Sequence, residues 1–200
     1  PCCGTGAYLV AVLERIAATL RANHGDALLA HDLKEAAMNR VFGFELLPAP
    51  FVVSHLQLGL LLQKLGVPLD EDERAAVYLT NALTGWEPPQ EEKRQITAAP
   101  FRRERAAAEQ VKQKEPILVV LGNPPYDSFA DVAVGEERAL SEAYRTTKRG
   151  PKPRGHGLND LYVRFYRMAE RRIVEQSGKG IVCFISNYSW LDGLSHPGMR

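Results

Sequence analysis

A short apolar run that ends in glycine, asparagine and two prolines constrains the fold of this chain more than any other feature. The run covers residues 117–121 and is followed by Gly122 and the tetrapeptide Asn123-Pro124-Pro125-Tyr126. Four to eight apolar, often β-branched residues bounded by Gly and Pro predict a buried strand of a parallel sheet. We therefore expect the tetrapeptide at the carboxyl end of a central strand, which is where open α/β sheets bind ligands.

The tetrapeptide offers two hydrogen-bond acceptors and one flat ring. The side-chain carbonyl of Asn123 and the backbone carbonyl of Pro124 accept hydrogen bonds, and Pro124 and Pro125 stiffen the backbone between them. Two acceptors aimed at one point would take both hydrogens of a planar amino group, which frees the lone pair of its nitrogen. Tyr126 provides a ring on which a heterocycle can stack. The alternative is a plain Pro-Pro turn with a surface tyrosine.

A G-x-G turn, Gly4-Thr5-Gly6, stands at the start of the chain before a predicted helix. Such a turn lets a ligand approach unpaired backbone N–H groups at the helix N-terminus. Leu9 stands where the dinucleotide fingerprint requires its third glycine, which argues against NAD. The alternative is a glycine-rich helix entry that binds nothing.

Two further predicted strands end in polar residues. One ends at Glu45, and the other is followed by Asn81 and Ala82. A carboxylate at a strand tip can accept the ribose hydroxyls of a nucleoside. Glu45 lies 45 − 4 = 41 residues after Gly4, against about 20 in the dinucleotide rule, so the helix between them must be an insertion. The alternatives are an acid that favours a helix dipole at Glu45 and an ordinary turn residue at Asn81.

Strands and helices are predicted to alternate along the chain. Predicted strands cover residues 41–45, 76–80, 117–121 and 181–185, and predicted helices cover residues 9–20, 26–39, 48–65, 101–114 and 161–174. This alternation predicts an α/β fold with a doubly wound, mostly parallel sheet. His55 lies inside an apolar helix and is expected to be structural. In the last helix, the arginines at positions 164, 167, 171 and 172 are expected to face solvent.

Residues 129–158 form a long polar stretch that we expect to be a loop. It contains Lys148, Arg149, Lys152 and Arg154 among glycines and prolines that break regular structure. A basic loop after the tetrapeptide could lie against nucleic-acid phosphates. The alternative is a solvated loop without a partner. Residues 85–100 are also predicted to be a loop.

Bulk properties narrow the setting of the chain. Its 200 residues carry a net charge of +1, so the case for a nucleic-acid partner has to be local. Cys2, Cys3 and Cys183 lack metal-ligand spacing, so we expect no metal and a cytoplasmic protein with reduced thiols. The sequence has no signal peptide and no apolar run long enough for a membrane. Because it begins at Pro1 inside a predicted functional loop and ends at Arg200 without a closing element, we expect a fragment truncated at both ends.

N-P-P-Y after a hydrophobic strand resembles motif IV of the amino-methyltransferases that use S-adenosylmethionine, which include the DNA adenine-N6 enzymes. The order of the other motifs agrees: G-x-G, a strand-end acid, a strand-end asparagine, N-P-P-Y, a helix with L-N-D-L-Y, and a strand with S-N-Y-S-W. This order resembles the gamma-class arrangement. The segments L-G-N-P-P-Y and L-N-D-L-Y look closest to the corresponding motifs of large single-polypeptide restriction–modification enzymes.

The resemblance implies the class I S-adenosylmethionine-dependent methyltransferase fold, which is Rossmann-like, with residues 1–200 as its catalytic core. The implied cofactor-binding residues are Gly4, Thr5, Gly6, Glu45, Leu46, Asn81 and Ala82. Leu46 would contact the adenine ring of S-adenosylmethionine, and Asn81 stands where the family often has Asp to hold the adenine amino group. Asn123, Pro124, Pro125 and Tyr126 are the implied catalytic residues.

The implied activity is methyl transfer to adenine N6 of a base flipped out of double-stranded DNA. Nuclease, helicase and target-recognition domains would share the full-length chain of such a restriction–modification enzyme. One alternative is an N-P-P-Y methyltransferase that acts on protein glutamine or RNA guanine. Others are a non-catalytic DNA-binding fragment and a dehydrogenase-like nucleotide binder, although the missing third glycine and the N-P-P-Y loop count against the last.

Overall fold

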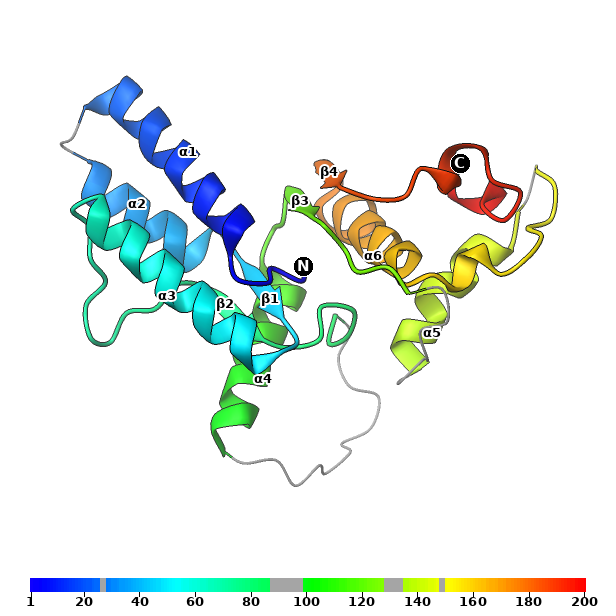
Figure 1. Cartoon of the computed structure of the whole chain (residues 1–200), viewed down its shortest axis with the longest axis horizontal. Coiled ribbons are helices and arrows are strands. Elements are labelled where there is room, and N and C mark those ends of the chain that lie inside the picture. Colours follow the sequence, from blue (N-terminus) through cyan, green and yellow to red (C-terminus); the bar gives the residue numbers. More distant parts are fainter. Residues whose placement is uncertain (26–27, 87–98, 128–134, 148–149) are drawn as a thin grey trace. The chain divides into compact units, whose positions relative to one another are not determined.

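The structure is a computed structural model that describes residues 1–25, 28–86, 99–127, 135–147 and 150–200 (Figure 1). The helices are α1 (Ala7–His24), α2 (Leu29–Asn39), α3 (Pro48–Lys64), α4 (Ala99–Lys114), α5 (Gly135–Glu142), α6 (Leu161–Glu170) and α7 (Ser189–Asp192). The strands are β1 (Gly43–Glu45), β2 (Val77–Leu79), β3 (Val119–Gly122) and β4 (Ile181–Phe184). The predicted strands are thus confirmed, with ends that differ by at most two residues, and the chain has a mixed α/β fold.

The chain divides into two compact units, each of which is described by itself. The amino-terminal unit holds residues 2–82 and α4 as far as Val111, and the carboxyl-terminal unit holds residues 1, 83–86 and 112–200. β1 pairs with β2 in the amino-terminal unit, and β3 pairs with β4 in the carboxyl-terminal unit, both in parallel. Parallel pairing is confirmed, whereas one doubly wound sheet through both pairs stays a prediction.

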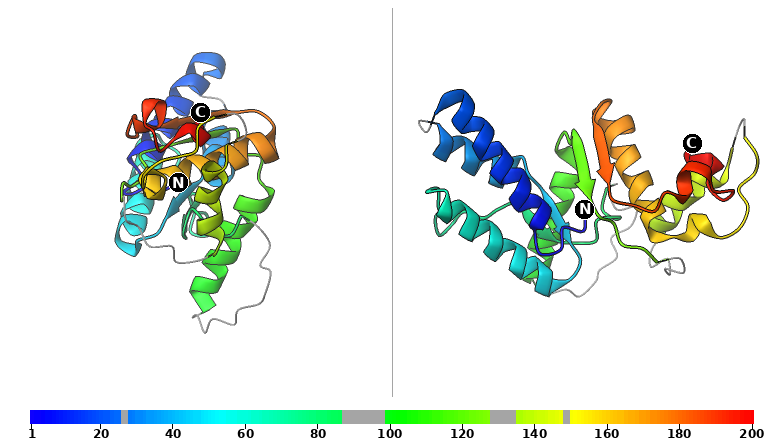
Figure 2. Two further views of the ribbon diagram at one scale, coloured as in Figure 1. Left: turned by 90° about the vertical axis from the view of Figure 1, so that its right-hand side faces the viewer. Right: turned by 45° about the horizontal axis from the view of Figure 1, so that its top comes forward.

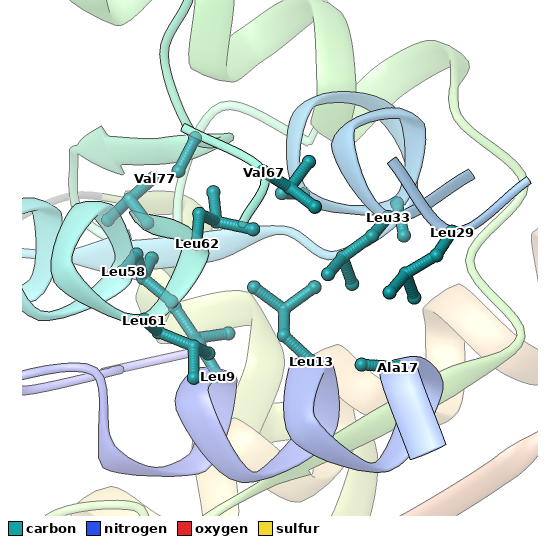
Figure 3. Packing of buried hydrophobic residues seen from close by; sticks show 13 residues of the cluster. Leu9, Leu13, Ala17, Leu29, Leu33, Leu58, Leu61, Leu62, Val67 and Val77 are labelled. Carbon is teal, nitrogen blue, oxygen red and sulfur yellow. The ribbon is translucent and has the colours of Figure 1, made fainter. Parts of the chain in front are cut away.

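One apolar core holds the amino-terminal unit together. Leu9, Leu13 and Ala17 follow each other at helical spacing on α1 and are buried. Figure 3 shows them in one cluster with leucines of α2 and α3, and Val77 of β2 belongs to the same cluster. Burying one leucine side chain stabilises a fold by about 1.5–3 kcal/mol, so this cluster fixes β2, which precedes Asn81 and pairs with β1, the strand that ends at Glu45.

The β3–β4 pair of the carboxyl-terminal unit packs against α6 (Figure 2). Val119 of β3 lies opposite Ile181 of β4, and the register continues to the end of both strands. Val120 points to the helix side, where it is buried with Ala169 and Ile173. This packing fixes the carboxyl end of β3, from which the tetrapeptide begins.

Two features of this unit differ from the structure predicted from the sequence. Residues 129–158 are not one loop, because α5 and a short 3₁₀-helix, Ala143–Arg145, lie within them. The helix expected over residues 161–174 begins at Leu161 as predicted but continues as a π-helix over Arg171–Ser177. The sequence does not predict α5 because this helix is mostly polar, and its buried positions include only one leucine, Leu140.

Two arginines predicted to face solvent are buried instead. Arg164 is 2% exposed and Arg172 is 3% exposed. Arg164 lies 3.4 Å from a carboxylate oxygen of Glu137, which is also buried. The guanidinium of Arg172 lies 5.5 Å from the ring centroid of Trp86. A buried cation needs an opposite charge or an aromatic face, and both partners come from distant parts of the sequence.

Candidate active site

The carboxylate of Glu45 accepts hydrogen bonds from several backbone groups at the carboxyl end of β1 in the amino-terminal unit. Glu45 ends β1, is 7% exposed, and accepts three backbone hydrogen bonds. Oε2 accepts the N–H of Gly4 at 2.8 Å, and Oε1 accepts the N–H groups of Leu46 and Leu47 at 2.9 Å each. These bonds use three of the roughly four acceptor sites of a carboxylate. About one acceptor position, on Oε2, is not used by these three bonds.

The Gly4-Thr5-Gly6 turn is tied to Glu45 and leads into α1. Gly4 and Gly6 have φ angles of +57° and +88°, which glycine adopts without strain. A Cβ added at Gly6 would lie 3.1 Å from Cβ of Ser54, whereas one at Gly4 would meet nothing within 4 Å. Gly6 therefore serves packing, and Gly4 faces open space. The first turn of α1, all of it described, holds no acidic side chain, so its N–H groups keep their partial positive charge.

Asn81 and Ala82 lie at the same edge because β2 runs parallel to β1. The N–H of Thr80 donates to the carbonyl of Glu45 at 2.7 Å, so the chain leaves both strands together. Asn81 is partly buried and Ala82 is buried, whereas the side chain of Leu46 is 63% exposed. The predicted cofactor residues of this unit thus lie at or beside the carboxyl ends of β1 and β2.

His55 has the structural role expected of it. Its Nε2 lies 3.2 Å from the carbonyl oxygen of Val77. Its ring meets Phe51 edge-on, with centroids 4.7 Å apart. Burial, together with the charge of Arg74, lowers the pKa of His55, so the ring is neutral at pH 7.

The Asn123–Tyr126 turn follows β3 in the carboxyl-terminal unit, as the sequence predicts. Pro124 is less than 2% exposed, whereas Asn123 and Pro125 are exposed and Tyr126 is 50% exposed. The hydroxyl of Tyr126 donates to the carbonyl of Ile185 at 2.8 Å and lies 3.4 Å from Oδ1 of Asn123. A buried proline therefore anchors a turn whose amide and aromatic side chains face outward.

Aromatic residues support the ring of Tyr126. Its centroid lies 6.0 Å from that of Tyr162, which lies 6.2 Å from Tyr166. Tyr162 is 2% exposed, and its hydroxyl lies 3.2 Å from Nε2 of His196. Burial raises the pKa of Tyr162 to about 12, so its hydroxyl stays protonated. Tyr126 is held by these neighbours, and half of its surface remains exposed.

Two of the four predicted phosphate-contacting residues lie in the described part of the chain. Lys152 and Arg154 are exposed. The N–H of Arg154 donates to the carbonyl of Leu194 at 3.1 Å, and the hydroxyl of Ser195 donates to the carbonyl of Arg154. The backbone of Arg154 is therefore hydrogen-bonded through both its N–H and its carbonyl, while its side chain is exposed. Lys148 and Arg149 lie outside the described residues, and the phosphate role of all four stays a prediction.

The predicted site residues form two groups, one in each unit. The cofactor group belongs to the amino-terminal unit, and the tetrapeptide and basic residues belong to the carboxyl-terminal unit. Sequence reasoning missed Asp160, whose carboxylate accepts the N–H of Asp127, the residue after the tetrapeptide. The signal present in the sequence was an Asp immediately before an apolar helix.

Two kinds of feature are absent from the described residues. No group of three or more His, Cys, Asp or Glu side chains among them could hold a metal ion. None of the helices in the described ranges is long and apolar enough to cross a membrane.

No protein-family model matches the chain, and no curated protein matches it either. Solved structures do share its fold. It is similar to the ATP-dependent Type ISP restriction–modification enzyme LlaBIII bound to DNA, with a TM-score of 0.76 and 22% identity. It is also similar to a nuclease-deletion mutant of the Type ISP restriction–modification enzyme LlaGI in complex with a DNA substrate mimic, with a TM-score of 0.77 and 20% identity. A third match is the DrdV–DNA complex, with a TM-score of 0.71 and 21% identity.

Each match covers all of this chain but only a small part of the known protein. They include 100% of this chain but only 13%, 16% and 18% of the LlaBIII, LlaGI and DrdV chains. The chain therefore spans less than a fifth of the length of these proteins. At such sequence identities the likeness establishes a shared fold.

Proposed function

We propose that this chain is the catalytic core of a class I S-adenosylmethionine-dependent DNA methyltransferase that modifies adenine at N6. The observation that carries the proposal is the turn after β3. Pro124 is buried there, while Asn123 and Tyr126 are both exposed at the carboxyl end of a parallel strand. A fixed backbone with an outward amide and an outward ring suits the presentation of a flat base that carries an amino group.

On the acceptor side, the tetrapeptide would orient the amino group. Oδ1 of Asn123 and the carbonyl of Pro124 would accept the two N6 hydrogens, which turns the nitrogen lone pair toward the methyl donor. The hydroxyl of Tyr126 donates to the carbonyl of Ile185. We therefore expect the ring of Tyr126, and not its hydroxyl, to contact the base by stacking. The base must leave the duplex first because its amino group is otherwise paired.

On the donor side, the residues present fit the cofactor. S-adenosylmethionine supplies an electrophilic methyl group on its sulfonium. Gly4 faces open space, and Glu45 keeps about one acceptor site for a ribose hydroxyl. Exposed Leu46 would contact the adenine ring, and Asn81 would accept a hydrogen bond from its amino group.

The solved structures with this fold favour DNA over protein glutamine or RNA guanine as the substrate. All three are complexes with DNA or a DNA substrate mimic, and two of them are restriction–modification enzymes. We assign this chain the modification step of such a system, in which nuclease, helicase and target-recognition parts would belong to the rest of a longer protein. Lys152 and Arg154 would contact phosphates of the bound duplex.

Calorimetric titration tests the proposal at the cofactor. We expect S-adenosylmethionine to bind the chain and NAD, the control nucleotide, not to bind. A chain that binds NAD and ignores S-adenosylmethionine would overturn the methyltransferase assignment. A panel of duplex DNA, a glutamine-containing peptide and a guanine-containing RNA, each incubated with radiolabelled S-adenosylmethionine, then identifies the acceptor. Label in DNA alone is the expected outcome.

A further inference from the structure

A reciprocal pair of hydrogen bonds ties the tetrapeptide to the start of α6. The carboxylate Oδ1 of Asp160 accepts the N–H of Asp127 at 3.3 Å. In return, the carbonyl of Asp127 accepts the N–H of Leu161 at 3.1 Å. Asp127 directly follows Tyr126, so both bonds act on the end of the catalytic turn. The two partners are 33 residues apart in the sequence, which makes this a tertiary contact.

Asp160 stands at the N-cap position of α6 but does not cap the helix with its side chain. Its backbone is extended, with φ −60° and ψ 137°, as an N-cap residue requires. An Asp at this position normally accepts an N–H of the first helical turn, yet Asp160 makes no such bond. The carboxylate reaches the loop instead, and the loop carbonyl of Asp127 accepts the first N–H of the helix. The residue is thus used for the turn rather than for the helix.

Other contacts hold the rest of the same turn. Pro124 is buried at its start. Tyr126 donates to the carbonyl of Ile185 after β4, and its ring lies 6.0 Å from that of buried Tyr162, two residues beyond Asp160. The start of α6 therefore contacts the turn through a carboxylate and through a ring. Asp160 supplies the side-chain acceptor of the reciprocal link that fixes its far end.

We infer that Asp160 is a positioning residue that sets the placement of Asn123 and Tyr126 relative to the acceptor base. This inference rests on the proposed methyl transfer and adds a residue to it. Asp160 acts through the backbone of Asp127 and does not itself touch the base. Because a misplacement of about 1 Å can reduce a rate about 100-fold, loss of this link should reduce kcat while the cofactor residues of the other unit are unchanged.

Two substitutions separate positioning from general destabilisation. Asp160→Ala removes the acceptor, whereas Asp160→Asn keeps an oxygen that can accept the same N–H. Asp192→Ala on α7 is the matched control, since Asp192 is exposed in the same unit. NMR hydrogen exchange at the amide of Asp127 and the side-chain amide resonances of Asn123 report the turn directly. Steady-state transfer to duplex DNA reports kcat and the KM for S-adenosylmethionine.

For Asp160→Ala we expect about 10-fold faster exchange at Asp127, shifted Asn123 resonances, and a kcat about 10- to 100-fold lower with an unchanged KM for S-adenosylmethionine. Asp160→Asn should restore most of each, and Asp192→Ala should match wild type. Unchanged exchange and resonances in a folded Asp160→Ala variant would overturn the inference, as would faster exchange with an unchanged kcat. If wild type itself transfers no methyl group, the proposed function fails, and the inferred positioning role fails with it. The exchange data then still decide whether Asp160 holds the turn.

Discussion

The replacement of Glu45 by Gln tests the cofactor side of the site with the smallest change in shape. In the structure, Oε1 accepts the N–H groups of Leu46 and Leu47, and Oε2 accepts the N–H of Gly4. A glutamine would keep its oxygen toward the first two amides. Its NH₂ group would then face the N–H of Gly4, which would lose its acceptor, and the expected ribose hydroxyl, which would lose a charged acceptor and meet a neutral donor instead.

The magnitude follows from the bonds that are lost. A hydrogen bond to a charged group contributes about 1.5–3 kcal/mol. Loss of the bond from a ribose hydroxyl therefore predicts a Kd for S-adenosylmethionine about 10- to 150-fold higher. Loss of the bond from the N–H of Gly4 should also lower the free energy of unfolding by about 1.5–3 kcal/mol.

Calorimetric titration and urea unfolding of the same samples check both values. Glu71→Gln makes the identical chemical change at an exposed position of the same unit, so its Kd and its unfolding free energy should match wild type. A folded Glu45→Gln protein that binds S-adenosylmethionine as tightly as wild type would refute the assignment of Glu45 to the ribose.

Three further predictions concern groups outside the site. Leu13→Ala should lower the free energy of unfolding by about 2–5 kcal/mol in urea titration, because Leu13 is 1% exposed in the apolar core. Iodoacetamide at pH 8 should modify Cys183 first in peptide mass mapping, because Cys183 is exposed while burial raises the pKa of Cys2 and Cys3 to about 11. The lowered pKa of His55 means that the unfolded chain takes up its proton first, so stability should fall as pH drops below the ordinary value of 6.5. The fall should be smaller in His55→Gln when urea unfolding is compared at pH 7.5 and pH 5.5.

Sequence reasoning located the strands because short buried parallel strands leave a local signal. Residues 117–121 and 181–185 are continuous apolar runs, and the structure pairs them in parallel as β3 and β4. The turn after β3 was predictable for the same reason, since Pro124 and Pro125 mark where the run ends. Local patterns of this kind decide where an element begins and ends.

The prediction that Arg164 and Arg172 face solvent was wrong because their partners are distant in sequence. An arginine on an amphipathic helix is ordinarily exposed. Here Glu137 of α5 and the ring of Trp86 make burial favourable. α5 itself lay within a polar stretch where few apolar residues mark a buried face. Asp160 was missed in the same way, since the sequence shows a helix cap and only the fold shows its bond to Asp127.

Methyl transfer to duplex DNA, with Asn123→Ala beside wild type, decides whether the tetrapeptide catalyses methylation of adenine N6. The chain is incubated with adenine-containing duplex DNA and S-adenosylmethionine labelled in its methyl group, and the nucleosides are then separated. We expect label in N6-methyladenine with wild type, none with Asn123→Ala, and equal binding of S-adenosylmethionine by both proteins. Label at any other nucleoside, or transfer by Asn123→Ala at the wild-type rate, would refute adenine-N6 methylation by this tetrapeptide.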